Sequence, residues 1–188
     1  MKRLIIFIPV LLFAFGCNNG QPGLQEIVYP AANNAPASTP EPPSNATTTV
    51  KVAVIALNDA GKNGPKIGCD DSMVYITKTI PQTAQVLNEA MKQLFSLDKE
   101  IIPATDSDQE YYNVIVKMKD LKFDHATLEN GLAKIYLTGN PAGLGGVCDS
   151  PRVPAQIEGT AKQFATVTSV ETYLNGAKVD WQEIFSQK

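Results

Sequence analysis

The residues of this chain that could do chemistry are few, and most of them lie in two short segments. Cys69 is followed by Asp70 and Asp71, and Cys148 is followed by Asp149. If the fold brings these segments together, two thiols and three carboxylates become neighbours. Such a group could hold a metal ion or form a disulfide beside a charged cluster.

A metal site fits these residue types poorly. Zinc favours cysteine and histidine ligands, and the only histidine of the chain, His125, lies in a different segment. Calcium takes oxygen ligands, usually from carboxylates that are spaced more closely than these. We therefore predict no metal site and no cofactor.

His125 is also the only candidate base for a Ser–His–Asp hydrolase. No serine lies in the Gly-x-Ser-x-Gly turn that exposes such a nucleophile. Paired carboxylates of the glycosidase type stay open, because their spacing is set in space and not along the chain. We predict no catalytic residue, and we interpret His125 as a partly exposed strand residue.

The N-terminus indicates export. Lys2 and Arg3 precede an apolar run over residues 4–15, which is typical of a secretory signal and short for a membrane span. Residues 14–17, Ala-Phe-Gly-Cys, resemble the lipobox of bacterial lipoproteins, in which the cysteine becomes the lipidated first residue. The sequence thus predicts a signal peptide over 1–17, lipidation of Cys17 and attachment to a membrane on the extracytoplasmic side.

With Cys17 assigned to lipid, Cys69 and Cys148 are the remaining thiols of the chain. An even pair outside the cytoplasm favours a disulfide. The bond would close a loop of roughly 80 residues and stabilise the fold by about 4 kcal/mol in the chain-entropy model. We predict this disulfide.

Residues 18–49 predict a tether. They are rich in proline, alanine, asparagine and threonine and poor in large apolar residues, so they cannot offset the entropy of folding. The globular domain is then residues 50–188. The net charge of -3 gives no general reason to bind nucleic acid, and none is predicted as a partner.

The apolar pattern of the domain predicts alternating strands and helices. We expect an amphipathic helix that starts at Pro81 and ends at Phe95, and a second helix over 154–168. Strands are expected over 50–57, 73–80 and 170–174, a hairpin over 119–128 and 132–138 with its turn at 129–131, and a returning strand over 177–181. The glycine-rich loop over 139–151 matches no nucleotide-binding fingerprint.

The order of these segments resembles the GerMN domain. The matching stretches are VKVAVIAL, TIPQTAQVLNEAMKQLF, LKFDHATLENGLAKIYLTG, a helix through Gln163, and VETYLNGAKV. The resemblance implies an α/β (α+β) fold in which a single two-layer domain packs two main helices on a mixed sheet. It also implies an extracytoplasmic role in envelope or sporulation assemblies, without established catalytic residues.

These observations predict a lipid-anchored, non-enzymatic module of the cell envelope. Its expected partner is an envelope protein or peptidoglycan. The alternative is a small secreted hydrolase or ligand-binding protein with a cleft between the 58–69 and 139–150 loops.

Overall fold

The structure, a computed structural model, describes residues 46–104, 109–142, 144 and 146–186. The predicted signal peptide, Cys17 and almost all of the predicted tether lie outside these residues. Within the described part, no helix has the length and apolar character needed to cross a membrane.

The strands form two sheets. The first is antiparallel and has the order β2-β1-β4-β3, with β1 at Thr47–Ala56, β2 at Ser72–Pro81, β3 at Ile101–Pro103 and β4 at Glu110–Tyr112. The second has the order β5-β6-β7-β8, with β5 at Lys122–Glu129, β6 at Leu132–Thr138, β7 at Ser169–Leu174 and β8 at Ala177–Lys178. It is mixed, because β6 and β7 run parallel while the other pairs are antiparallel.

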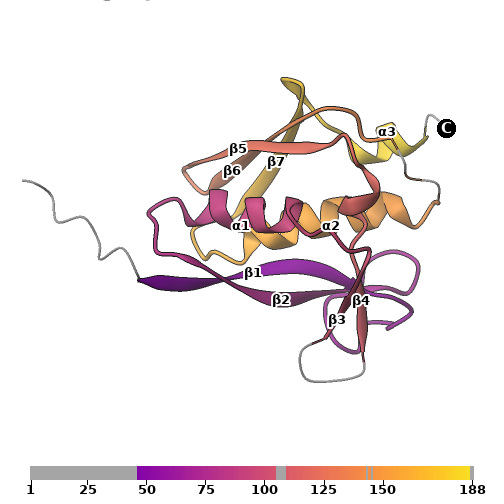
Figure 1. Ribbon diagram of the computed structural model, residues 1–188. Helices are drawn as coiled ribbons and strands as arrows, with labels where there is room; N and C mark the ends of the chain where they lie inside the picture. The colour runs from indigo at the N-terminus through magenta and orange to yellow at the C-terminus, as the bar shows by residue number, and fades with distance from the viewer. Residues whose placement is uncertain (1–45, 105–108, 143, 145, 187–188) are drawn as a thin grey trace, which may run out of the picture. The chain divides into compact units, whose positions relative to one another are not determined.

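Two helices, α1 (Val86–Phe95) and α2 (Asp149–Lys162), lie between the sheets and contact both of them (Figure 1). A short 3₁₀ helix, η1 (Ile115–Lys117), and a final helix, α3 (Trp181–Ser186), complete the domain. The predicted α+β class is confirmed. The strands divide between two sheets where one mixed sheet was expected, since an apolar strand pattern does not say which sheet the strand joins.

The main core is shared by both sheets and both helices. It contains Val52 of β1, Met91 of α1, Ile135 of β6 and Ile157 of α2, none of which has any exposed surface. Each such side chain contributes roughly 1.5–3 kcal/mol by leaving water. The two sheets are therefore stabilised through the helices that separate them.

Two tight turns agree with the sequence. Asn130 and Gly131 join β5 to β6 with φ of 50° and 83°, and Asn175 and Gly176 join β7 to β8 with φ of 51° and 85°. Asparagine and glycine tolerate this left-handed region, which a two-residue hairpin turn requires at both positions.

The predicted helix starts were wrong. Pro81 is the last residue of β2, paired with Thr47, and α1 begins only at Val86. The ladder continues this far because β1 already begins at Thr47, before the expected start at residue 50. In the second helix, α2 begins at Asp149, before the expected residue 154, and it ends at Lys162.

The start of α2 differs from the expected one because the segment before residue 154 is already helical. Pro151 lies in the first turn of α2, where a missing N–H breaks no helical bond. Pro154 lies inside the helix. Further along the chain, Trp181 begins α3 instead of ending a strand.

Side chains of α2 and of Gln163, the residue that caps its C-terminus, close one edge of β1. The Gln163 amide accepts from the Lys51 N–H and donates to the Lys51 carbonyl, both at 2.6 Å. Thr160 Oγ1 accepts from the Ala53 N–H at 3.0 Å, and Gln156 Nε2 donates to the Ala53 carbonyl at 2.9 Å. These side chains take the place of a neighbouring strand.

Asn88 of α1 does the same for β5. Its Oδ1 accepts from the Ala126 N–H at 2.8 Å, and its Nδ2 donates to the Ala126 carbonyl at 2.9 Å. Ala126 follows the irregularity in the β5–β6 register between Phe123 and His125. Both central helices thus present amides to the edge of a sheet.

Candidate functional site

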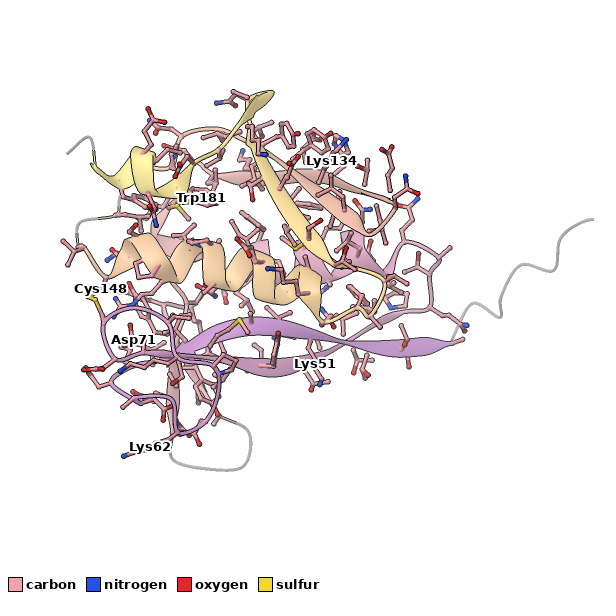
Figure 2. The ribbon with its side chains drawn as sticks, turned by 180° about the vertical axis from the view of Figure 1, so that it is seen from behind. Lys51, Lys62, Asp71, Lys134, Cys148 and Trp181 are labelled. Carbon is pink, nitrogen blue, oxygen red and sulfur yellow. A yellow bond between two sulfur atoms is a disulfide. The ribbon has the colours of Figure 1, made fainter. Side chains whose placement is uncertain are left out.

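The two cysteine–aspartate segments meet at one end of the domain (Figure 2). Cys69 lies in the loop between β1 and β2, and Cys148 directly precedes α2. The structure contains the predicted disulfide between them, with a Cα–Cα distance of 5.6 Å. Cys69 is exposed and Cys148 is partly buried.

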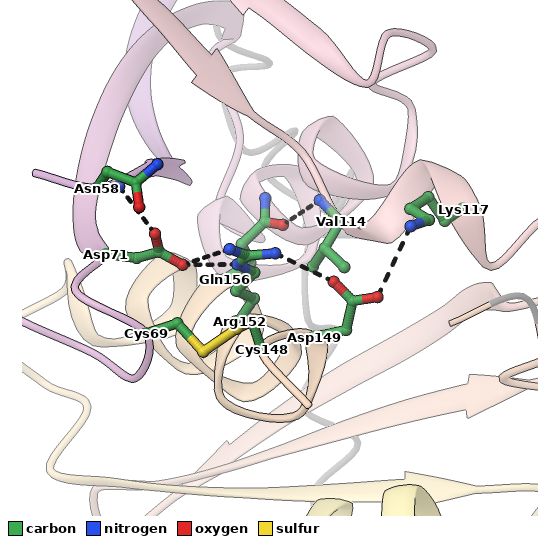
Figure 3. Close-up of polar contacts among 9 residues, drawn as sticks. All are labelled: Asn58, Cys69, Asp71, Val114, Lys117, Cys148, Asp149, Arg152 and Gln156. Atoms are coloured by element: carbon green, nitrogen blue, oxygen red, sulfur yellow. Dashed lines mark hydrogen bonds and ion pairs between the residues drawn. A yellow bond between two sulfur atoms is a disulfide. The ribbon is translucent and has the colours of Figure 1, made fainter. Parts of the chain in front are cut away.

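Asp71 is the most deeply buried carboxylate of this end, with 1% of its surface exposed. Its Oδ2 accepts from Arg152 Nε at 2.7 Å and lies 2.7 Å from Arg152 Nη2 (Figure 3). Its Oδ1 accepts from the Asn58 N–H at 3.0 Å. Charge-assisted contacts of this kind can offset the cost of burying a charge.

Asp149 is also buried, and it contacts the same guanidinium through a different nitrogen. Arg152 Nη1 lies 3.3 Å from Asp149 Oδ1, and Lys117 Nζ lies 3.7 Å from Asp149 Oδ2. The guanidinium is 5.1 Å from the centre of the Tyr112 ring, within the range of a cation–π contact. We call Asp71, Tyr112, Lys117, Asp149 and Arg152 the ionic cluster.

Two groups of the ionic cluster have shifted pKa values. Burial raises the pKa of the Tyr112 hydroxyl, and the negative charge of Asp149 raises it further. Burial acts to lower the pKa of Lys117, but Tyr112, Asp149 and Glu100 outweigh it, so the pKa of Lys117 is raised. At neutral pH, Tyr112 is therefore neutral and Lys117 carries its charge.

A buried amide lies beside the ionic cluster. Gln156 Oε1 accepts from the Val114 N–H at 2.8 Å (Figure 3). Its Nε2 donates to Ala53 O and to Asn113 Oδ1, at 2.9 and 3.2 Å. Among the described residues, every buried side-chain nitrogen and oxygen has a hydrogen-bond partner. This end of the domain is thus a satisfied polar network.

The loop between β1 and β2 also makes an apolar contact with α2. A Cβ at Gly68 would lie 2.6 Å from Pro151 Cγ, in the first turn of α2, so only glycine permits this approach. The disulfide, the Asp71–Arg152 pair and this contact fasten the two segments together at three points. The chemical role of these contacts is to hold the two cysteine–aspartate segments together.

Not all the sequence candidates join the network. Asp70 forms an exposed ion pair with Lys66 at 2.6 Å, and the Lys66 hydrogen bond and charge lower the pKa of Asp70. His125 belongs to β5, where its ring stacks on Tyr136 at 4.3 Å and its Nδ1 lies 3.0 Å from Asp124. Across the ranges that the structure describes, no three histidine, cysteine or acidic residues group so as to hold a metal ion.

The surface pockets lined by described residues include three whose linings contain no residue of the 58–69 or 139–150 loops, although Lys117 of the ionic cluster lines one of them. The largest of them, about 580 Å³, opens between α2, β8 and α3 and is lined by Pro154, Glu158, Lys178, Val179, Asp180, Trp181 and Gln182. The other two lie near Phe95 and near Lys119. None of these three pockets is the cleft between the 58–69 and 139–150 loops that we expect for a hydrolase or ligand-binding protein.

Sequence reasoning missed the basic residues of the cluster. Arg152 follows Asp149 by three positions on what is now known to be a helix, a spacing that places both on one face. This signal was hidden because the helix was expected to begin at Pro154. Lys117 could not be found from the sequence, since it reaches Asp149 through tertiary contact alone.

The fold and this network define a disulfide-braced α+β domain. No protein-family model matches the chain, and no curated protein sequence matches it. Among solved structures, the chain is similar to the first GerMN domain of the sporulation protein GerM from Bacillus subtilis, with 15% identity and a TM-score of 0.48 over 70% of this chain and 86% of that one.

A structure of the tandem GerMN domains of the same protein gives 16% identity and a TM-score of 0.47, again over 70% of this chain. The match covers 40% of the tandem structure. Both similar structures are GerMN domains, the family that the sequence resembles. These likenesses concern the fold alone.

Proposed function

We propose that this protein is a lipid-anchored module of the bacterial cell envelope that acts by binding a partner and not by catalysis. The observation that carries the proposal is that the candidate reactive side chains are bonded to one another. Asp71 and Asp149 both contact Arg152, and Cys69 and Cys148 are bonded to each other. The groups best suited to chemistry thereby hold the fold together.

The anchor is the second part of the proposal. A lipidated Cys17 followed by the proline-rich 18–49 segment would hold the domain at the membrane and let it reach outward. Fully extended, that segment spans on the order of 100 Å at about 3.1 Å per residue. The partner is an envelope protein or peptidoglycan within this reach.

The proposal is tested by chemical crosslinking in the intact cell, followed by mass spectrometry of the tagged full-length chain. The wild type is compared with Cys17→Ser, and labelling with radioactive palmitate checks the lipid in each. We expect label and a defined set of envelope partners with the wild type, and neither with Cys17→Ser.

The matched control is the double variant Cys69→Ser, Cys148→Ser, which removes two thiols but keeps Cys17. It should retain the palmitate label, because that label depends on Cys17 and not on the fold that the disulfide holds. A wild type that carries no label, or whose crosslinked species do not rise above background, would overturn the proposal.

A further inference from the structure

The outer edge of β2 is an open strand edge. All ten residues of β2 pair with β1 on one side. On the other side, the loop after β1 covers only the beginning: the Met73 N–H donates to the Pro65 carbonyl at 2.9 Å, and Lys66 and Ser72 form an isolated bridge. Beyond Met73, no described residue bonds to the outward backbone of β2.

The outward backbone groups can be identified from β1. Lys51 and Ala53 direct their N–H and C=O groups at α2, and so away from β2. Their register partners are Thr77 and Tyr75. In an antiparallel ladder, both members of such a pair point away from each other, so Tyr75, Thr77 and, two residues on, Thr79 direct their backbone groups outward.

This edge differs from the edges that the helices cover. Gln163, Thr160 and Gln156 close β1, and Asn88 closes β5 at Ala126. Thr77 and Thr79 are exposed, and Tyr75 is 37% exposed although its hydroxyl donates to the Gly159 carbonyl of α2 at 3.1 Å. An open edge of this length is a template for an additional strand.

Charge indicates what kind of strand would pair there. β1 and β2 together carry two charged residues, Lys51 and Lys78, and no acidic residue. Lys51 Nζ lies 5.8 Å from the centre of the exposed Tyr75 ring (Figure 2 shows Lys51 on this hairpin). No described carboxylate forms an ion pair with either lysine. The edge therefore favours a strand that carries glutamate or aspartate.

We propose that β2 binds an extended acidic segment of a partner protein, which adds to the first sheet as a further strand at Tyr75, Thr77 and Thr79. This inference rests on the proposed function, since it names the surface through which the module binds. A second copy of the chain suits the edge less well, because its own β2 offers a lysine and no acidic residue.

The test uses variants that separate the backbone donor from the side chain. Thr77→Pro removes one outward N–H, and it leaves the β1–β2 ladder in place because that N–H faces away from β1. Thr77→Val is the matched control, since it keeps the N–H and is a good strand former. Both are compared with the wild type as full-length chains in detergent micelles.

The probe is a nine-residue peptide of alternating valine and threonine with two glutamates, and its twin has lysine in place of glutamate. Nuclear magnetic resonance follows the backbone amides. We expect the glutamate peptide to protect the amides of Tyr75, Thr77 and Thr79 from hydrogen exchange in the wild type and in Thr77→Val. Affinity should fall by about tenfold or more for Thr77→Pro and for the lysine twin.

The proposal is overturned if the glutamate peptide does not bind, if Thr77→Pro binds it equally well, or if the lysine twin matches it. Protection that appears without peptide and grows with protein concentration would assign the edge to a second copy and also overturn it. In cells, crosslinked partners that persist in Thr77→Pro but vanish in Cys17→Ser would defeat this inference while leaving the proposed function intact.

Discussion

At the scale of single residues, Arg152 is the group on which two buried carboxylates depend. It contacts Asp71 at 2.7 Å through Nε and Nη2, and Asp149 at 3.3 Å through Nη1. Asp71 has 1% of its surface exposed, so water cannot replace a lost partner. The cost of removing the arginine is therefore the cost of an unpaired buried charge.

We predict that Arg152→Met lowers the free energy of unfolding by about 3–5 kcal/mol, the range for breaking a buried pair on one side. The matched control is Lys162→Met, which removes a cation that pairs with Glu158 on the surface at 2.7 Å. Its cost should be about 1 kcal/mol or less. Urea unfolding of the oxidised proteins measures both, and equal losses would contradict this account.

The raised pKa values of Tyr112 and Lys117 determine how the free energy of unfolding changes at alkaline pH. Both have pKa values raised in the folded protein, so the folded state keeps protons that the unfolded chain releases as the pH rises through about 10. Their contribution is complete below that pH and is lost as the pH rises through the raised values. The free energy of unfolding should thus fall as the pH rises from about 10 through the raised pKa values.

In Tyr112→Phe, the hydroxyl is lost but the ring beneath Arg152 remains. We expect a shallower alkaline fall than in the wild type, because one of the groups responsible is gone. Tyr75, whose pKa burial also raises, still contributes in both proteins. Denaturant titrations at several pH values between 8 and 11 measure the slope, and an unchanged slope would refute the assignment to Tyr112.

At the scale of elements, α2 organises the domain because it serves both the sheet edge and the ionic cluster. Its close approach to the first sheet depends on Gly159. A Cβ there would lie 3.0 Å from Ala53 Cβ and would collide with Met73 Sδ, and Tyr75 donates from its hydroxyl to the Gly159 carbonyl at 3.1 Å. The Met73 side chain could turn aside, but Ala53 is part of β1.

We predict that Gly159→Ala destabilises the protein by about 1–3 kcal/mol, since the added methyl group overpacks the contact with β1. This outweighs the gain of roughly 1 kcal/mol that alanine brings to a helix interior. Gly146→Ala is the control, because its nearest atom is Cys148 N at 4.0 Å. Thermal or urea unfolding measures both, and a stabilised Gly159→Ala would contradict the packing.

The sequence predicted which elements exist better than where they begin. The apolar residues Leu87, Met91 and Leu94 predicted α1, and the Asn130-Gly131 pair predicted the hairpin, because both signals act within one element. The start of α1 was wrong because Pro81 was taken as part of a first helical turn, and α2 begins at Asp149, before the expected residue 154. At Pro81, the long ladder with β1 outweighed that local preference.

At the scale of the whole molecule, the two-sheet arrangement was beyond the reach of the sequence. The β6–β7 pairing, the closing of β1 by Gln163 and the meeting of Lys117 with Asp149 all join residues far apart in the chain. The disulfide could be predicted, because only two thiols remained once Cys17 was assigned elsewhere. Its ionic neighbours could be predicted in part, since the aspartates flank the cysteines.

The residues whose contacts hold the fold differ from the exposed residues that other molecules can reach. Asp71, Asp149 and the two cysteines belong to the first group by their contacts. Among the sequence candidates, Asp70 and His125 are exposed, and changing them should leave the fold intact. They are therefore the residues through which a catalytic function would reveal itself.

The measurement that tests the central claim most directly is in-cell crosslinking of the double variant Asp70→Asn, His125→Gln beside the wild type. Thermal unfolding establishes first that both are equally folded. A module that acts by binding through another surface should retain the same partners at the same yield. A folded double variant that keeps the partners but loses the cellular effect of the protein would contradict the claim and point to chemistry at these residues.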